Sequence, residues 1–583
     1  MRLISIAESL EGYNRRVFAS DAAAALVVTF LLVPQSLAYA MVAGLPPEMG
    51  LYSSMFPLIF YAVLGTSRTL SVGPVAVVSL MTATSVGRIA EQGSIGYVGA
   101  AVALAALSGC ILIGMGLARL GPLASLLSRP VMSGFISASA VLIAISQLQH
   151  LLGVSAAGSN LPAIILDLIR HWNEMLLPTL AFGLASMGFL LSTKLWGCSA
   201  LQLLGFSRTS ALNLVKLAPA VLVLAVLLLG FLISYHRIGL PVVGAFTADL
   251  PTLVIPRLSA ELWAELTTSA LLIALVGYIE SVTVAKTLAA KREQTVDPDR
   301  ELVALGAANV ASSVSGGFPV SGGFSRSVVN FDAGAQTQVA SILAAIAMAL
   351  VILFAAPLLY QLPKTVLAAA IIVAVLSLVD FQMIFAAWRY SHSDFAAVSV
   401  TILFTLMLGV ELGVLVGILL SISLHFHRTT KPHVAVIGEV PGTGHFRNVR
   451  RHSVITDPGV LSLRIDESLH FANADYLRKV VSDLLREQNW QVEHLVLQCS
   501  AVNAIDLSAV LMMQELCESL SQRGIALHLS EVKGPVMDSL KRSDMLARLS
   551  GRVFLCQQQA MEALTGDTTF SIQQNTGVGS PSR

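Results

Sequence analysis

Residues 65–79 read GTSRTLSVGPVAVVS, and residues 316–329 read GGFPVSGGFSRSVV. Both stretches lie among long apolar runs, but they are too short and too rich in Gly, Pro and Ser for full helical crossings, which take about 20 apolar residues. Each pattern predicts an extended segment that leads into a short helix. Two such interruptions at matching points in two halves of a chain are typical of inverted-repeat transporters, whose broken helices meet near the middle of the bilayer.

The start of a short helix inside a membrane favours an anion. Its first N–H groups lack intrahelical partners and carry a partial positive charge. The alternative for each stretch is that Gly and Pro only relieve helix packing, as small residues often do in membranes. The presence of two such stretches, with Arg326 in the second, favours a binding site.

The composition places most of the chain in lipid. Of the 583 residues, 55% are hydrophobic and only 12% are charged, whereas soluble domains carry roughly 25% charged residues. Residues 1–430 hold 40 charged side chains, and the much shorter remainder holds 31. We therefore predict a cytosolic N-terminal segment (1–20), a membrane domain (21–430), a small α/β domain (431–565) and a disordered tail (566–583).

Apolar runs predict 14 membrane spans, because the run at 395–427 is too long for one crossing of a core about 30 Å thick and counts as two. Glu411 is expected to mark the turn between these two spans. An even number of spans puts both termini on one side, and the basic pairs Arg15–Arg16 and Lys291–Arg292 fit a cytoplasmic face. We expect a multi-pass protein of the cell inner membrane with both termini in the cytoplasm. The remaining runs begin at Ala22 and recur near 51–65, 97–118, 131–148, 176–195, 211–233, 267–290, 335–356 and 364–379, with weaker segments at 70–85, 300–314 and 317–330.

Arg326 and Glu280 are the charged residues that we expect deep in the membrane. A buried cation costs a few kcal/mol and normally has a partner or a function. Asp332 is a poor local partner for Arg326, because it lies about 120° away around a helix. We expect Arg326 to help bind an anion; the alternatives are snorkelling to an interface or pairing with a carboxylate on another span.

Glu280 lies eleven residues before Lys291, which places it about 16 Å inside the membrane. Burial at that depth disfavours the charged carboxylate and makes Glu280 a candidate proton carrier. The alternative is a structural salt bridge, for example with Arg326.

Several classes of function are not indicated by the sequence. The five cysteines are scattered without a C-x-x-C pair, and the net charge is only +1. We find no nucleophile and base pair, nucleotide-binding loop or metal-binding cluster. We therefore expect neither an enzyme nor a nucleic-acid-binding protein, no metal site, and no cofactor apart from protons as the coupling ion.

Longer motifs carry a family resemblance. Residues 33–53 read VPQSLAYAMVAGLPPEMGLYS, residues 65–68 GTSR, residues 72–74 VGP and residues 324–334 FSRSVVNFDAG. These motifs closely resemble the sulfate permease (SulP) family of anion transporters, here as a bacterial member, and the C-terminal region resembles its STAS domain. The resemblance implies an α-helical polytopic membrane protein with 14 spans in two inverted seven-span repeats, a core domain that moves against a gate domain, and a homodimer.

The resemblance also implies an anion held between spans 3 and 10. Glu280 matches the span-8 carboxylate of proton-coupled members. Val75 departs from animal members, which often have Phe there, and leaves a wider pocket. The residues that would line the site are Gln35 and Tyr39 from span 1, Gly73, Pro74, Val75 and Ala76 from span 3, and Ser325 and Arg326 from span 10.

The soluble domain offers one candidate regulatory residue. Leu461, Leu463 and Ile465 alternate with polar residues and predict a strand, and Asp506 is expected to cap a helix. The STAS loop often carries a phosphorylatable Ser, and here Ser508 could accept phosphate at the helix N-terminus. The alternative is that Ser508 is an ordinary first-turn residue.

Taken together, these features predict proton-coupled sulfate uptake by an alternating-access, elevator-like mechanism. The alternatives within transport are a bicarbonate or dicarboxylate symporter and a proton-independent anion exchanger. From other classes, the chain could be a channel or an anion-gated regulator that signals through its STAS domain. The expected partners are a small inorganic oxyanion, membrane lipid, a second copy of the chain and a cytosolic partner of the STAS domain.

Overall fold

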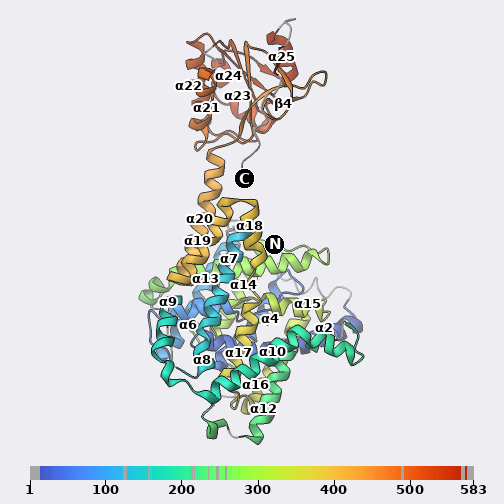
Figure 1. The fold of residues 1–583 in the computed structure, drawn as a ribbon, viewed down its shortest axis with the longest axis vertical. Coiled ribbons are helices and arrows are strands. Elements are labelled where there is room, and N and C mark those ends of the chain that lie inside the picture. The colour runs from blue at the N-terminus through green and yellow to red at the C-terminus, as the bar shows by residue number, and fades with distance from the viewer. Residues whose placement is uncertain are drawn as a thin grey trace. The chain divides into compact units, whose positions relative to one another are not determined.

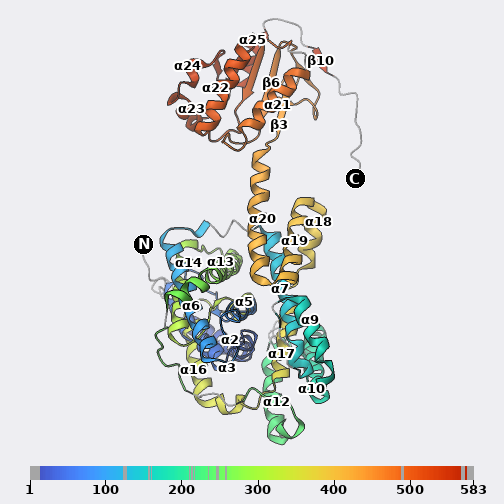
Figure 2. The same cartoon turned by 90° about the vertical axis from the view of Figure 1, so that its left-hand side faces the viewer.

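The computed structural model describes residues 13–122, 128–154, 158, 160–208, 211, 214–215, 217–233, 235–244, 249–256, 259–487, 491–565 and 571–573. The chain divides into two compact units, Met1–Ile422 and Ser423–Arg583. The division falls within helix α20 (Val410–Thr430), slightly before the boundary expected from composition. The first unit is helical, and the second combines a sheet with helices (Figures 1 and 2).

Two very short strands, β1 (Val72–Gly73) and β2 (Ser321–Gly322), interrupt the helical unit. The 3-10 turns η2 (Trp172–Glu174) and η3 (Tyr235–Ile238) lie in its connections. Its α-helices are α2 (Arg15–Val42), α3 (Pro47–Tyr52), α4 (Phe56–Leu64), α5 (Ala76–Val86), α6 (Ile95–Leu117), α7 (Arg129–Ser146), α8 (Leu148–Leu152), α9 (Leu161–Arg170), α10 (Leu177–Leu203), α12 (Ala218–Leu232), α13 (Ala260–Ala290), α14 (Pro298–Val314), α15 (Phe324–Asp332), α16 (Val339–Leu359), α17 (Lys364–Leu376), α18 (Phe381–Tyr390) and α19 (His392–Leu408), followed by α20.

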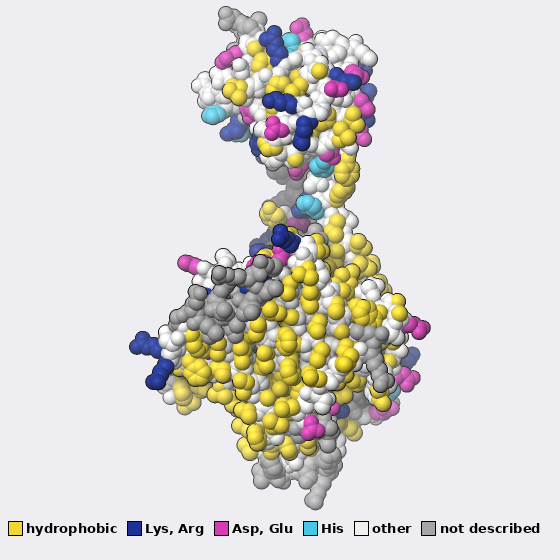
Figure 3. Space-filling view, turned by 180° about the vertical axis from the view of Figure 1, so that it is seen from behind, with side chains coloured by type: hydrophobic (Ala, Val, Ile, Leu, Met, Phe, Trp, Pro, Cys, Tyr) yellow, Lys and Arg dark blue, Asp and Glu magenta, His cyan; other side chains and the backbone are white. Residues whose placement is uncertain are grey.

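Seven helices of the described chain are long and apolar enough to cross a bilayer, judged by length and composition. Four further apolar helices are shorter, so the count of 14 spans stays a prediction. The run at 395–427 divides into α19 and α20 at Gly409, as expected. Hydrophobic side chains cover one face of this unit almost without interruption (Figure 3), as lipid contact requires. The seven long helices span Arg15–Val42, Ile95–Leu117, Arg129–Leu152, Leu177–Leu203, Ala260–Ala290, Lys364–Tyr390 and Val410–Thr430, and the four shorter ones Ala76–Val86, Ala218–Gly230, Val339–Ala355 and His392–Leu408.

Helices α6 and α14 pack most closely, through a pair of glycines. A Cβ on Gly109 would lie 2.8 Å from the carbonyl oxygen of Gly306, and a Cβ on Gly306 would lie equally close to the oxygen of Gly109. Small residues allow such close backbone approach between helices in membranes, where packing replaces the hydrophobic effect as the attraction. Helix α14 also packs against α4, so α14 joins α4 and α6.

The second unit is a mixed sheet with the strand order β10-β5-β3-β6-β7-β8-β9, and β4 pairs with β3. Strands β6 to β9 are parallel, whereas β3 runs antiparallel to β6. The strands are β3 (Val434–Glu439), β4 (Phe446–Asn448), β5 (Val454–Thr456), β6 (Val460–Ile465), β7 (His494–Gln498), β8 (Ala526–Ser530), β9 (Val553–Phe554) and β10 (Ser571–Gln573), and the helices are α21 (Ala474–Glu487), α22 (Leu507–Ser521), α23 (Gly534–Lys541), α24 (Met545–Arg548) and α25 (Gln557–Thr565).

Both faces of this sheet are covered, as expected for an α/β domain. Leu461, Leu463 and Ile465 of β6 are buried with α21 and α22 on one face, which confirms the predicted strand. Val460 packs on the other face with Met561 of α25. In the tail that we expect to be disordered, residues 571–573 form β10 against β5, and residues 566–570 and 574–583 lie outside the described chain.

Candidate functional site

Strands β1 and β2 bring the two interrupted stretches side by side in the helical unit. They pair antiparallel, with Val72 opposite Gly322 and Gly73 opposite Ser321. Ser71 and Gly323 extend the pairing, because the Gly323 N–H donates to the Ser71 carbonyl at 3.2 Å. Two parts of the chain that are remote in sequence thus share one small piece of sheet.

A short helix begins directly after each strand. Helix α5 begins at Ala76 after the extended residue Val75, and α15 begins at Phe324 after the extended residue Gly323. Neither helix start is capped by a side chain. At about 1.5 Å per residue, α5 and α15 are about 16 and 14 Å long, roughly half the thickness of a bilayer core. The prediction of an extended segment that leads into a short helix is confirmed for both stretches.

Arg326 lies in the first turn of α15 and is 2% exposed. Its Nη2 donates a hydrogen bond of 2.8 Å to the carbonyl oxygen of Pro74, on the other interrupted stretch. Its Nη1 is buried and has no hydrogen-bond partner among the described residues. A buried guanidinium nitrogen without an acceptor is costly, which favours an anion or a water at this atom.

Two glycines make room for this guanidinium group. A Cβ on Gly73 would lie 2.6 Å from Nη1 of Arg326, and a Cβ on Gly323 would lie 2.8 Å from its Nε. Both distances are shorter than any van der Waals contact, so a larger residue at either position would displace Arg326. The glycines of the two stretches are therefore required by the arginine and not only by helix packing.

Tyr39 and Glu280 lie near Arg326. The three groups interact electrostatically with one another, and Tyr39 and Glu280 are half-buried. No hydrogen bond or ion pair joins Glu280 to Arg326 in the part of the chain that the structure describes. The direct salt bridge that we considered for Glu280 is thus not formed here, although the two charges are close enough to influence each other.

The other predicted site residues occupy the same region. Gln35 lies four residues before Tyr39 on α2, so both share one helix face. Val75 and Ala76 are buried at the start of α5, whereas Ser325 is exposed in the first turn of α15. Helices α2 and α13 each pack against both α5 and α15. The structure therefore packs together the four helices that carry the predicted residues.

Polar side chains of α13 and α14 hold β2 in place. Ser281, the neighbour of Glu280, accepts a hydrogen bond from the Gly322 N–H at 2.8 Å. Asn309 of α14 accepts from the Val320 N–H at 2.9 Å and donates to its carbonyl oxygen at 3.0 Å. These bonds satisfy the backbone of an extended segment that could not otherwise stay inside a bilayer.

Sequence reasoning missed two buried carboxylates, of which Glu301 supports the first interrupted stretch and Asp21 holds the segment that follows α15. Glu301 of α14 accepts hydrogen bonds from the Tyr61 hydroxyl at 2.7 Å and from the N–H and hydroxyl groups of Thr66 at 2.8 and 2.6 Å. Asp21 of α2 accepts from the Gln336 N–H at 2.7 Å and the Thr337 hydroxyl at 2.5 Å. The signal in the sequence that could have identified them is an acidic residue inside a largely apolar segment.

Glu411 is not itself the turn between α19 and α20. The turn lies at Gly409, which has a φ of 99° and is therefore in a conformation that favours glycine. Glu411 lies in the first turn of α20, is 5% exposed, and forms an ion pair of 2.7 Å with Arg88. It also accepts hydrogen bonds from Ser85 at 2.6 Å and Ser269 at 3.0 Å. Glu411 thus links α20 to α5 and α13.

In the second unit, Ser508 is exposed in the first turn of α22. Asp506 caps this helix, because its Oδ1 accepts a hydrogen bond of 2.8 Å from the Ala509 N–H. The predicted cap is confirmed, and the hydroxyl of Ser508 is accessible.

Comparisons with known proteins agree with these features. The sequence pattern of the sulfate permease family matches residues 18–401, and that of the STAS domain matches residues 452–560. The chloroplastic sulfate transporter 4.1 of Arabidopsis thaliana is 34% identical over 582 residues, which cover 96% of this chain and 83% of the relative. The probable sulfate transporter Rv1739c of Mycobacterium tuberculosis is 33% identical over 553 residues, which cover 94% of this chain and 96% of the relative.

Solved structures share the fold. SLC26A9 superimposes with a TM-score of 0.86 at 23% identity, covering 97% of this chain and 93% of its own. The transmembrane domain of the cyanobacterial bicarbonate transporter BicA gives a TM-score of 0.58 at 20% identity, covering 70% of this chain and 98% of its own. At these identities the likeness concerns the fold alone.

Proposed function

Because this chain belongs to the sulfate permease family and carries a STAS domain, we propose that it is a secondary active transporter that moves sulfate into the cell together with protons. The observation that carries this proposal is the buried Nη1 of Arg326, which has no hydrogen-bond partner among the described residues and lies between the starts of two short helices. An oxyanion at this position would accept from the guanidinium group and from the first N–H groups of α5 and α15.

The charges favour a dianion when Glu280 is protonated. Each helix start contributes roughly half a positive charge, and Arg326 contributes one, so the site offers about two positive charges to its ligand. An ionised Glu280 cancels about one of them and leaves a site suited to a monoanion. Sulfate binding and protonation of Glu280 should therefore favour each other, which is the basis of symport.

Movement of the loaded site completes the cycle. We infer that α2, α5, α13 and α15 belong to a core domain that moves past a gate domain, in an elevator-like alternation of access. The proposed arrangement has 14 spans in two inverted repeats, both termini in the cytoplasm and two copies in the inner membrane. The antiparallel pairing of β1 with β2 supports the inverted repeat, because it joins one interrupted stretch from each half.

The same charges define the main alternative. If Glu280 stays ionised through the cycle as an electrostatic partner of Arg326, the site suits a monoanion such as bicarbonate, or a proton-independent exchanger. Buried Val75 at the start of α5 leaves room for ligands other than sulfate, such as dicarboxylates. Counterflow experiments in proteoliposomes with sulfate, bicarbonate, fumarate and chloride show which of these anions the protein transports.

The deciding experiment is sulfate uptake into proteoliposomes with and without an inward proton gradient. We expect saturable uptake that the gradient accelerates, and we expect Glu280→Gln to abolish the acceleration. Glu265→Gln is the matched control, because Glu265 lies on the same helix and is exposed. Unchanged gradient dependence in Glu280→Gln would reject the proton role, and wild-type sulfate affinity in Arg326→Ala would reject the site.

We also propose that Ser508 is a regulatory phosphorylation site through which a cytosolic partner acts on the STAS domain. Its exposure at the start of α22 supports this, since phosphate is favoured at a helix N-terminus. Ser508→Asp should change partner binding or transport rate, and Ser508→Ala should remove any effect of phosphorylation.

A further inference from the structure

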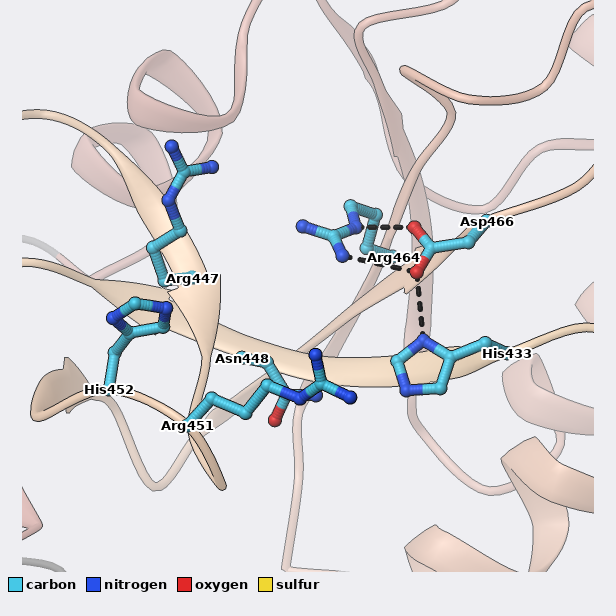
Figure 4. A pocket seen from close by; sticks show the side chains of 7 residues that line it. All are labelled: His433, Arg447, Asn448, Arg451, His452, Arg464 and Asp466. Carbon is cyan, nitrogen blue, oxygen red and sulfur yellow. Dashed lines mark hydrogen bonds and ion pairs between the residues drawn. The ribbon is translucent and has the colours of Figure 1, made fainter. Parts of the chain in front are cut away.

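A polar pocket lies in the α/β unit, apart from the proposed transport site. It has a volume of about 430 Å³, within the range of small-molecule sites. It lies along the hairpin of β3 and β4, the turn that leads toward β5, and the end of β6 (Figure 4). Its lining residues are all polar: His433, Arg447, Asn448, Arg451, His452, Arg464 and Asp466.

The pocket carries a positive charge that its own residues do not cancel. Three arginines face one acidic residue, Asp466, and that carboxylate is already engaged. Asp466 accepts from Arg464 Nε at 2.5 Å and from His433 Nδ1 at 2.8 Å. Burial alone would raise the pKa of Asp466, but these two hydrogen bonds hold it below its ordinary value, so the group remains ionised and occupied at neutral pH.

The two remaining arginines are available to a ligand. Within the described residues, the guanidinium groups of Arg447 and Arg451 have no hydrogen-bond or ion-pair partner. Figure 4 shows Arg451 and Arg464 reaching from opposite sides toward one open space, with Arg464 turning its free nitrogen away from Asp466. Arg447 and Arg451 are exposed, so solvent screens the repulsion between them, and an anion in the pocket would be attracted by both and by Arg464.

The turn that carries Arg451 and His452 is held in shape. The Asn448 side chain accepts a hydrogen bond of 2.8 Å from the Arg450 N–H, and its carbonyl oxygen accepts from the N–H groups of Arg451 and His452 at 3.0 and 3.1 Å. A preorganised turn reduces the entropy lost on binding. The backbone that carries Arg451 and His452 is therefore in place before any ligand arrives.

We propose that this pocket binds an anion that carries more than one phosphate charge. Guanidinium groups match phosphate oxygens with paired hydrogen bonds, and imidazoles add donors. The lack of apolar lining excludes a site built for an aromatic ring, and the volume exceeds the needs of a single inorganic ion. The phosphate could belong to a soluble diphosphate or to a lipid headgroup, because His433 follows the candidate span α20 by three residues.

The test uses the full-length protein in nanodiscs at low salt and neutral pH, with inorganic pyrophosphate as the probe in titration calorimetry. In discs of neutral phosphatidylcholine we expect one pyrophosphate per chain. Arg447→Gln and Arg451→Gln should each weaken binding by about tenfold, the effect expected when a hydrogen bond to a charged group is lost. Arg450→Gln is the matched control, because Arg450 lies on the same turn, is exposed and does not line the pocket.

Discs that contain cardiolipin, whose headgroup carries two phosphates, identify the source of the phosphate. If the anionic lipid weakens pyrophosphate binding in the wild type but not in Arg451→Gln, the ligand is a headgroup; if binding is unchanged, the ligand is soluble. The proposal is overturned if the wild type binds neither pyrophosphate nor the anionic lipid. It is also overturned if Arg450→Gln loses as much affinity as Arg451→Gln, because the attraction would then be nonspecific. Since the measurement is binding, failure of sulfate transport would not affect it.

Discussion

The position of the Arg326 guanidinium group depends on two neighbouring residues that have no side chain. Its guanidinium group fills space that a side chain at Gly73 or Gly323 would occupy, and its hydrogen bond to Pro74 fixes one nitrogen while leaving another free. The need for glycine at these positions therefore follows from the size of one cation. The same close contact makes the site sensitive to the smallest possible substitution.

The first prediction concerns Gly73→Ala. Its added Cβ would lie 2.6 Å from Nη1 of Arg326, so the guanidinium group must move and the anion loses its best donor. We expect the sulfate concentration for half-maximal uptake to rise by about tenfold or more. Gly99→Ala is the control, because its Cβ would meet nothing within 4 Å. Equal affinities in the two variants would contradict the role assigned to Arg326.

A second prediction concerns His528 in β8 of the α/β unit. Burial, with contributions from His494 and Arg552, lowers the pKa of His528 from 6.5 to about 4. Its Nδ1 already accepts a hydrogen bond of 3.0 Å from the Arg552 N–H. Protonation of this nitrogen would therefore break that hydrogen bond. The folded pKa lies below the unfolded one, so this unit should lose stability as the pH falls from about 6.5 to 4, by at most about 1.4 kcal/mol per pH unit.

Hydrogen exchange of the full-length protein, corrected for the intrinsic rate, measures this loss in peptides from β7 and β8. His528→Asn keeps an acceptor near the Nδ1 position but cannot titrate, so its exchange should depend less on pH. His445→Asn replaces an exposed histidine and serves as the control. The same pH profile in His528→Asn and the wild type would show that another group is responsible.

At the scale of elements, the interrupted stretches were predictable and their partners were not. Gly, Pro and Ser within an apolar chain are local signals, so residues 65–79 and 316–329 could be identified from composition alone. Glu301 stabilises the first stretch through Thr66, which lies 235 residues away in the sequence. A single sequence shows that such a carboxylate exists but contains no information about which backbone groups it will bind.

The membrane spans show the same limit of prediction from sequence. The run at 395–427 was correctly divided into two helices, because its length exceeds one crossing. The function of Glu411 in that run was not predicted, since its contacts with Ser85, Arg88 and Ser269 come from α5, from the turn that follows α5, and from α13. Length and polarity set the elements, whereas side-chain contacts between distant elements decide what a buried charge does.

A third prediction tests the link between α5 and α20. Removing Arg88 leaves the buried carboxylate of Glu411 with only two serine donors, whereas removing both charges leaves no uncompensated charge. Arg88 is largely exposed, so we expect a coupling energy of about 1 kcal/mol. The thermal midpoint of Arg88→Gln/Glu411→Gln should therefore lie above the value that the two single variants predict additively. Arg68→Gln, which removes another exposed arginine, controls for general charge effects; strict additivity would exclude the link.

At the scale of the whole molecule, the two units differ in what their charges do. The few charges that the helical unit buries are held by hydrogen bonds or an ion pair or lie beside the proposed anion site, whereas the α/β unit gathers several arginines around an open pocket. The low overall charge of the sequence therefore indicated the lipid environment but not this division of roles.

The fourth prediction concerns the side of the membrane on which the α/β unit lies. Cys556 is exposed in the α/β unit, while Cys499 and Cys517 are buried. In a background with Cys110→Ala and Cys198→Ala, an impermeant maleimide should label intact cells only after permeabilisation, because we propose that this unit is cytosolic. Cys556→Ser should abolish the signal. Equal labelling before and after permeabilisation would place the α/β unit outside.

The hydrogen bond from Arg326 to Pro74 also bears on how the protein is made. The two residues are 252 positions apart, and at about 5–20 residues per second the ribosome needs on the order of ten to fifty seconds to deliver the second after the first. During that interval, β1 and the start of α5 have no partner strand in the membrane. The first half of the chain must therefore be sheltered, by the insertion machinery or near the headgroups, until the second half emerges.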